Sequence, residues 1–199
     1  MSKTIEFLFD FGSPNAYLSY PLIKGIAERH GASLEITPIL LGGLFKITGN
    51  QAPMVAFGGI PNKIAYEMLE MKRFIEKHGL SKFKMNPFFP VHTVLIMRGL
   101  IAAKEAGVDE SYINAVLTAI WEDEKNMSEE AVVREVLESA GLDANRLLIE
   151  AVSNPVKEKL KSNTQVAANR GAFGIPTFFI GSEMFFGKER LAQVEEALG

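Results

Sequence analysis

One serine stands where a short apolar run gives way to a helical pattern, in the stretch Asp10-Phe11-Gly12-Ser13-Pro14. Serine is a favoured helix N-cap and proline suits the first helical position, so the plainest interpretation of Ser13 is a cap. The same position offers chemistry, because a hydroxyl and free N–H groups at the positive end of a helix stabilise an anion. Since no base stands beside it, Ser13 is a poor nucleophile and is better suited to donate a hydrogen bond to a bound thiolate.

The rest of the composition excludes several other chemistries. The chain has no cysteine, which removes disulfides, cysteine-ligated zinc and thiol nucleophiles, and its three histidines (His30, His78 and His92) are too widely spaced to predict a metal site. Its 21 basic and 24 acidic residues leave no basic surplus for a nucleic-acid partner. No signal-like segment and no apolar run near the roughly 18 residues of a membrane span is visible, so we expect a cytoplasmic protein.

The elements around Ser13 follow from the spacing of apolar residues. Residues 5–9 predict a buried strand, residues 14–30 a helix that stops at Gly31, and residues 33–37 a second strand. A connection of this length predicts parallel pairing with a right-handed crossover. The following segment, 42–62, is rich in Gly, Pro and Asn and is expected to be a long loop with at most a short helical turn.

A block of amphipathic helices comes next, and strands return only near the end of the chain. The helices are expected over residues 63–78, 92–106, 111–121, 128–140, 143–154 and 163–170. Ser128 is expected to cap the fourth of these, with acidic residues in its first turn. Residues 177–180 and 184–186 predict a hairpin, and residues 188–198 a last helix.

A βαβ unit and a ββα unit joined through a helix make a thioredoxin fold, here with a helical insertion. Gly174-Ile175-Pro176-Thr177 resembles the cis-proline loop of such proteins, and Ser13-Pro14-Asn15-Ala16 stands where they carry Cys-x-x-Cys. Taken together, six motifs resemble the 2-hydroxychromene-2-carboxylate isomerase family, relatives of kappa-class glutathione transferases and periplasmic disulfide oxidoreductases. They are FDFGSPNAYLSY (9–20), TGN (48–50), NKIAYEMLEMKRF (62–74), FFPVHTVLIMRG (88–99), GAFGIPTFFIG (171–181) and MFFGKERL (184–191).

The resemblance covers nearly the whole chain and implies two domains. Residues 1–62 with 161–199 are expected to form a thioredoxin-like, glutathione-binding domain of α/β class, and residues 63–160 an all-α insertion domain. His92 and Phe186 depart from the family pattern, which commonly has Asn and Trp there.

The resemblance also implies a glutathione site, and glutathione supplies the sulfur that this chain lacks. It implies that Ser13 holds the thiolate, that a cis Pro176 presents the backbone of Ile175 to the cysteinyl unit, and that four side chains contact the rest of the tripeptide: Asn50, Lys63, Lys188 and Glu189. Each of these four also has a plainer interpretation: Asn50 as a turn residue, Lys63 as a solvated lysine, and Lys188 and Glu189 as residues in the first turn of a helix. Arg190 fits a structural ion pair.

An aromatic pocket between the two domains is expected for the substrate. Its candidate residues are Phe11, Asn15, Tyr17, Phe88, Phe89, Pro90 and His92, with core packing as the alternative for the aromatic rings. His92 is a candidate proton carrier, with a structural hydrogen bond as the alternative.

The function implied by the resemblance is glutathione-dependent isomerisation of 2-hydroxychromene-2-carboxylate-type substrates to trans-o-hydroxybenzylidenepyruvate in aromatic degradation. There the thiolate adds to the conjugated substrate, a carbon–carbon bond rotates, and the thiolate leaves. The alternatives are a kappa-like transferase or peroxidase for other electrophiles, and a non-catalytic glutathione-binding protein. The relatives also imply a homodimer.

Overall fold

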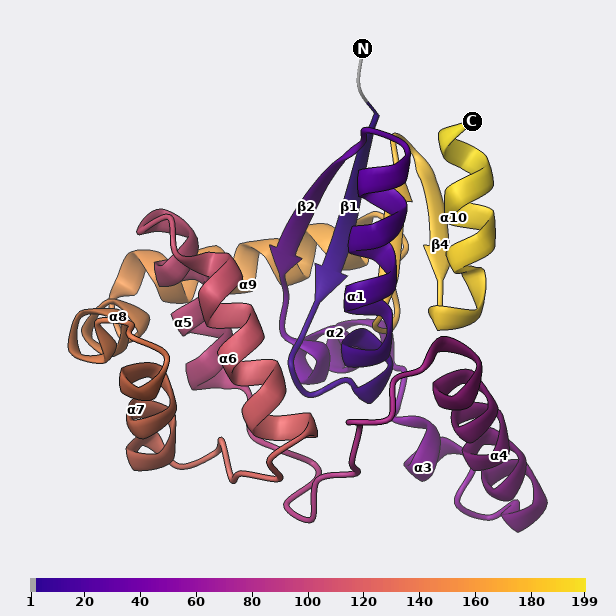
Figure 1. Cartoon of the computed structure of the whole chain (residues 1–199), viewed down its shortest axis with the longest axis horizontal. Coiled ribbons are helices and arrows are strands. Elements are labelled where there is room, and N and C mark those ends of the chain that lie inside the picture. Colours follow the sequence, from indigo (N-terminus) through magenta and orange to yellow (C-terminus); the bar gives the residue numbers. More distant parts are fainter. Residues whose placement is uncertain (1–2) are drawn as a thin grey trace.

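The computed structural model describes residues 3–199 and has a four-stranded mixed sheet at its centre (Figure 1). The strands are β1 (Thr4–Phe9), β2 (Ser33–Pro38), β3 (Thr177–Ile180) and β4 (Glu183–Phe186), in the order β2-β1-β3-β4. β1 runs parallel to β2 and antiparallel to β3, with Phe7 opposite both Ile36 and Phe178. The predicted α/β, thioredoxin-like fold with a helical insertion is therefore confirmed.

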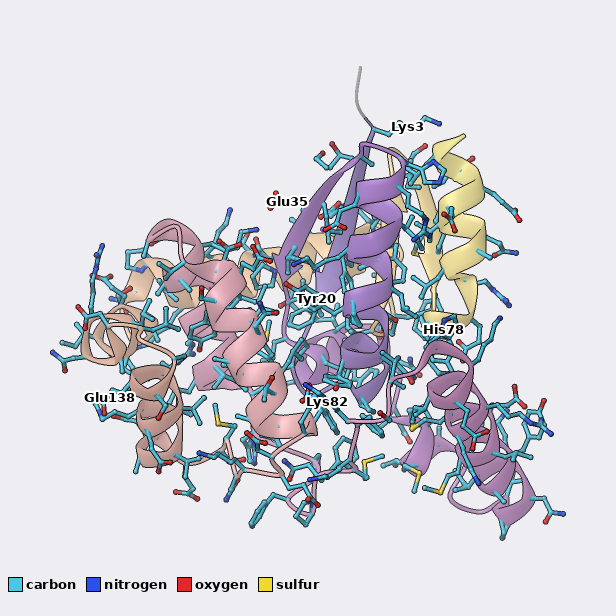
Figure 2. The ribbon with its side chains drawn as sticks, in the orientation of Figure 1. Lys3, Tyr20, Glu35, His78, Lys82 and Glu138 are labelled. Carbon is cyan, nitrogen blue, oxygen red and sulfur yellow. The ribbon has the colours of Figure 1, made fainter. Side chains whose placement is uncertain are left out.

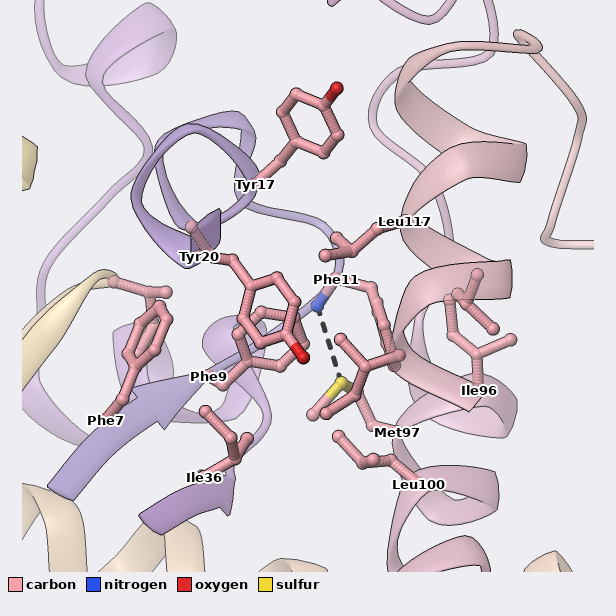
Figure 3. Packing of buried hydrophobic residues seen from close by; sticks show 14 of the residues in the cluster. Phe7, Phe9, Phe11, Tyr17, Tyr20, Ile36, Ile96, Met97, Leu100 and Leu117 are labelled. Atoms are coloured by element: carbon pink, nitrogen blue, oxygen red, sulfur yellow. Dashed lines mark hydrogen bonds between the residues drawn. The ribbon is translucent and has the colours of Figure 1, made fainter. Parts of the chain in front are cut away.

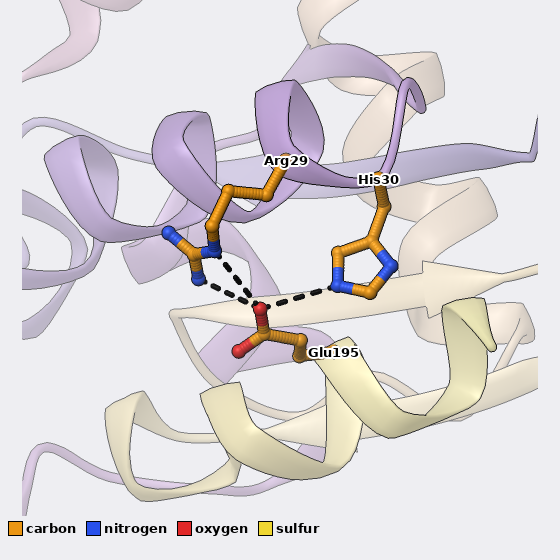
Figure 4. Close-up of polar contacts among 3 residues, drawn as sticks. All are labelled: Arg29, His30 and Glu195. Atoms are coloured by element: carbon orange, nitrogen blue, oxygen red, sulfur yellow. Dashed lines mark hydrogen bonds and ion pairs between the residues drawn. The ribbon is translucent and has the colours of Figure 1, made fainter.

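Three helices lie against the sheet. α1 (Pro14–Arg29) connects β1 to β2, α9 (Asn154–Asn169) precedes β3 and contacts β2, and α10 (Leu191–Leu198) follows a short 3-10 turn, η1 (Lys188–Arg190). α1 and α10 lie side by side (Figure 1). Their ends are joined by the Glu195 carboxylate, which accepts hydrogen bonds from Arg29 and lies 3.2 Å from the His30 ring (Figure 4). Hydrogen bonding from Arg29 lowers the pKa of the Glu195 carboxyl.

Seven helices separate β2 from α9. They are α2 (Leu41–Thr48), α3 (Pro53–Ala56), α4 (Pro61–His78), α5 (Val94–Glu105), α6 (Asp109–Trp121), α7 (Glu130–Ser139) and α8 (Ala144–Ala151). The prediction of a long loop over 42–62 was wrong, because α2 and α3 lie there. Two of the five glycines in this segment, Gly42 and Gly43, belong to α2. A Cβ on Gly43 would meet Thr164 of α9 at 3.4 Å, so a small residue suits this close helix contact.

The helix boundaries before β3 also differ from the prediction. α8 ends at Ala151, three residues before the predicted end at 154. α9 then begins at Asn154 and includes residues 155–162, for which no helix was predicted, before it continues through the predicted helix over 163–170 to Asn169. Pro155 stands in the first turn of α9, where a proline starts a helix instead of ending one. The expected domain boundaries at 62/63 and 160/161 therefore fall inside α4 and α9. Ser128 does not cap α7, whose N-cap is Glu129, and its hydroxyl instead accepts a hydrogen bond from the backbone of His92.

One hydrophobic core connects the sheet to the inserted helices (Figure 3). Phe7, Phe9 and Phe11 form a chain of edge-to-face contacts with ring centroids 5.4 and 4.9 Å apart. The backbone N–H of Phe11 lies 3.5 Å from Met97 Sδ of α5, and its carbonyl accepts a hydrogen bond from Trp121 Nε1 at 3.0 Å. The end of β1 is thus held by side chains from α5 and α6, which fixes the loop that carries Ser13. Within residues 3–199, no helix combines the length and apolar character needed to cross a membrane.

Candidate functional site

Ser13 caps α1, as predicted, and also contacts the loop before β3. Its Oγ accepts a hydrogen bond from Ala16 N at 3.2 Å and donates one to the carbonyl of Ile175, also at 3.2 Å. The residue is only 4% exposed. The hydroxyl therefore lies at the positive end of α1, just beneath the surface, with its single proton directed at a neutral acceptor.

The loop over residues 173–176 has the predicted cis peptide bond between Ile175 and Pro176. It is braced on both sides, since Thr177 Oγ1 donates to Gly174 O at 2.7 Å and Gly187 N donates to Pro176 O at 2.9 Å. The N–H of Ile175 donates to no acceptor within residues 3–199. This loop therefore leaves one backbone donor free immediately beside the Ser13 hydroxyl.

Gly174 approaches an aromatic ring closely. A Cβ on Gly174 would lie 2.8 Å from the ring of Phe186, which itself packs on Phe173 with ring centroids 4.5 Å apart. Because no side chain fits at residue 174 without moving that ring, the glycine holds the loop against β4.

Two further predicted ligand-binding regions lie next to the same loop. Asn50 follows the end of α2, and its Nδ2 donates to Phe173 O at 2.7 Å. Lys188 and Glu189 directly follow Gly187, whose N–H donates a hydrogen bond to the carbonyl of Pro176. Lys188 is 5% exposed, its ammonium is paired with Glu189, and it lies 5.1 Å from the centroid of the Phe74 ring of α4.

Lys63 makes its contacts elsewhere. Its Nζ lies 4.2 Å from the centroid of the Phe57 ring and 3.9 Å from Glu67 Oε1, one turn further along α4. No hydrogen bond or ion pair within residues 3–199 joins Lys63 to the Ser13 region. Its predicted contact with glutathione stays a prediction.

The predicted substrate residues lie in four different places. Phe11 has no exposed area and packs between Phe9 and Tyr112, so the core interpretation holds for its ring and it does not line an open pocket. Asn15 is partly buried, and its Oδ1 is covered and has no hydrogen-bond partner within residues 3–199.

Phe88, Pro90 and His92 are exposed on the segment that leads into α5. An unpredicted second cis peptide bond joins Phe89 to Pro90, and the Phe89 ring lies 6.2 Å from that of Trp121.

Tyr17 lines a hollow of about 450 Å³ between α1 and α6, and a second hollow of about 490 Å³ adjoins it. The Tyr17 hydroxyl donates to Glu122 Oε1 at 3.0 Å, and burial followed by this carboxylate raises the Tyr17 pKa. Figure 2 shows Tyr20 in the space between the same helices. Burial, then Glu110 and Asp109, raises the Tyr20 pKa to about 12, so both phenols stay protonated at neutral pH.

Asp10, three residues before Ser13, was not among the predicted site residues. It is 1% exposed, and its carboxylate accepts hydrogen bonds from Gly12 N at 2.9 Å and Leu41 N at 2.7 Å. Burial raises the pKa of this carboxyl, and the donors of Leu41, Gly12 and Thr93 partly offset that rise. The sequence did offer one indication, because Asp10 is an acidic residue directly after the apolar run of β1. Within residues 3–199, no three His, Asp or Glu side chains gather as a metal site.

Comparison with known proteins places these features in context. Residues 4–199 match the family model of the DsbA-like thioredoxin domain. The chain is 31% identical to a 2-hydroxychromene-2-carboxylate isomerase of Sphingobium xenophagum over 202 residues, covering all of this chain and 99% of that protein. It is 27% identical to glutathione S-transferase kappa 1 of Rattus norvegicus, covering 99% and 91%. A solved structure of 2-hydroxychromene-2-carboxylate isomerase superposes with a TM-score of 0.83 at 26% identity, covering 98% and 94%.

Proposed function

The chain belongs to the family of DsbA-like thioredoxin domains, among the 2-hydroxychromene-2-carboxylate isomerases and kappa-class glutathione transferases, and from this we propose that it is a glutathione-dependent isomerase. Its substrates would be of the 2-hydroxychromene-2-carboxylate type, converted to trans-o-hydroxybenzylidenepyruvate in aromatic degradation. The observation that carries the proposal is the Ser13 hydroxyl, placed at the N-terminus of α1 and 3.2 Å from the carbonyl before the cis proline.

The residues at this place suit a thiol-bearing peptide. Ile175 offers a free N–H donor next to the Ser13 hydroxyl, and an extended peptide pairs with such backbone groups as an added strand does. Lys188 and Glu189 provide opposite charges at the other end of the loop, which suits an α-amino-carboxylate group such as that of a γ-glutamyl unit. Asn50 would contact the peptide from the end of α2, and Lys63 from α4.

The role of Ser13 is to stabilise a negative charge. A hydrogen bond to a charged acceptor contributes about 1.5–3 kcal/mol, compared with about 0.5–1.5 for a neutral one, so a thiolate would draw the proton away from Ile175 O. The helix dipole of α1 acts in the same direction. Bound glutathione would supply a nucleophilic thiolate that this chain, without cysteine, does not contain.

The aromatic substrate would lie between the two parts of the chain. Tyr17 and Asn15 would contact it from α1, and Phe88, Pro90 and His92 from the segment before α5. The Tyr17 hydroxyl donates its one proton to Glu122 Oε1 in the structure, so contact with a substrate carbonyl would require that hydrogen bond to turn from Glu122 to the substrate. His92, exposed and near the start of α5, would offer its imidazole to the substrate from this segment.

The test is turnover of 2-hydroxychromene-2-carboxylate with and without glutathione, followed by the change in absorbance and by product identification. The proposal predicts that the trans product forms only when glutathione is present, and that calorimetry detects glutathione binding. Product formation at an equal rate without glutathione would contradict it.

A kappa-like transferase or peroxidase is the second candidate, supported by the kappa-class relatives. A chloronitroarene separates the two, because a transferase forms a stable glutathione conjugate whereas an isomerase releases glutathione unchanged. Glutathione binding without turnover of either compound would favour a non-catalytic binding protein.

We propose a homodimer as well, with α3 and α4 at its interface. α4 contributes no buried residue, and apolar side chains of this region are exposed: Met54, Val55, Ile60, Tyr66, Met68 and Leu69. Pairing with a second copy would cover them by a twofold, self-complementary contact. Sedimentation equilibrium tests this, and a monomer at micromolar concentration would refute it. The cytoplasmic location stays a prediction.

A further inference from the structure

Asp10 brings three parts of the chain to one carboxylate. It accepts from the N–H of Gly12 with one oxygen and from the N–H of Leu41 with the other, at 2.9 and 2.7 Å. The Thr93 hydroxyl is a third hydrogen-bonding partner. Asp10 and Thr93 are 1% and 7% exposed, so these contacts are made away from water.

Each of these donors lies beside a part of the proposed site. Gly12 directly precedes Ser13, whose own N–H donates to the carbonyl of Asp10 at 3.2 Å. Leu41 is the first residue of α2, and the far end of that helix leads to Asn50. Thr93 is the N-cap of α5 and follows the segment of Pro90 and His92.

The packing at this junction leaves little freedom. A Cβ on Gly12 would lie 3.1 Å from Thr93 Cγ2 and 3.4 Å from Asp10 Oδ1. The carboxylate also suits its place chemically, since an ionised aspartate offers only acceptors and three donors face it. An asparagine would direct its NH₂ group at one of those donors.

We propose that Asp10 is the positioning residue of the site, holding the Ser13 loop, the start of α2 and the start of α5 in fixed relation. Through Gly12 it sets the position of the Ser13 hydroxyl against Ile175 O, and through Leu41 the placement of the helix that leads to Asn50. This inference rests on the proposed function for its consequence and on the geometry alone for the contacts themselves.

The test compares Asp10→Asn with Tyr112→Phe, which removes another buried hydrogen bond, from the Tyr112 hydroxyl to Ile96 O at 2.9 Å, away from Ser13. Hydrogen exchange and glutathione binding of both variants are measured at a temperature at which both are fully folded. Asp10→Asn should speed hydrogen exchange at Gly12 and Leu41 and weaken glutathione binding at least tenfold, whereas Tyr112→Phe should leave exchange at these two amides and glutathione affinity within about twofold of wild type. If Asp10→Asn does not fold, Thr93→Val, which removes one donor and keeps the shape, should also speed exchange at Gly12 and Leu41.

Unchanged exchange at both amides would overturn the inference, as would an equal loss of glutathione affinity in Tyr112→Phe. A wild-type protein that binds no glutathione would refute the proposed function instead. In that case, exchange at Gly12 and Leu41 still decides whether Asp10 holds the two elements together.

Discussion

Replacing Ser13 by alanine separates its role as a helix cap from its role as a donor to a thiolate, because the first affects the free energy of unfolding and the second affects turnover. The substitution removes the N-cap contact to Ala16 N and the donor to Ile175 O. Loss of a serine cap costs about 1 kcal/mol, and loss of a neutral hydrogen bond about 0.5–1.5 kcal/mol. The free energy of unfolding should therefore fall by about 2 kcal/mol.

The effect on turnover should be larger than this loss of stability explains. If Ser13 donates to a thiolate, its removal costs about 1.5–3 kcal/mol, which lowers kcat/KM by roughly 10- to 100-fold. The matched control is Asp143→Ala. Asp143 caps α8 through Arg146 N at 3.0 Å, so its loss costs a similar cap energy in a helix remote from Ser13. This control should leave kcat/KM unchanged.

The assay pairs denaturant unfolding with glutathione-dependent turnover, at a temperature where all three proteins are folded. The absorbance of bound thiolate, followed against pH, adds an independent measurement: without the Ser13 hydroxyl, the pKa of bound glutathione should rise towards that of free thiol. Equal kcat/KM in Ser13→Ala and Asp143→Ala would refute the catalytic role and leave Ser13 as a cap only.

Two other predictions concern stability. Gly99→Ala should destabilise the protein by about 1–3 kcal/mol in urea unfolding, because the new Cβ would lie 2.1 Å from the buried Tyr112 hydroxyl. This loss should exceed the gain in helix propensity, which is about 1 kcal/mol. The loss should be smaller in a Tyr112→Phe background, and an increase in stability would contradict the prediction. Glu195→Gln should lower Tm at neutral pH and have no effect in acid, since hydrogen bonding from Arg29 lowers the Glu195 pKa, so its stabilisation is present above the ordinary value of 4.5 and is lost as pH falls through the lowered value. A Tm difference independent of pH would contradict it.

The sequence predicted those features that local chemistry determines. Ser13 at a helix start and Pro176 before a strand are each recognisable within a few residues, and the order of elements around them indicates the thioredoxin fold. α2 escaped prediction because Gly43 suits its contact with Thr164 of α9, more than a hundred residues further along the chain. Asp10 was not predicted for the same reason, since its structural role depends on contacts with Leu41, 31 positions away, and with Thr93. Contacts between distant segments leave little trace in local patterns.

The contact between Ser13 and Ile175 explains why a serine serves at this position in the proposed enzyme. The hydroxyl has one proton and donates it to the carbonyl of Ile175, for which no other donor is found among residues 3–199. A thiolate is the stronger acceptor, but taking the proton leaves Ile175 O unpaired, at a cost of about 1–3 kcal/mol. A ligand with a backbone amide can satisfy that carbonyl, whereas a simple thiol cannot. The arrangement therefore favours a thiol that belongs to a peptide, as the thiol of glutathione does.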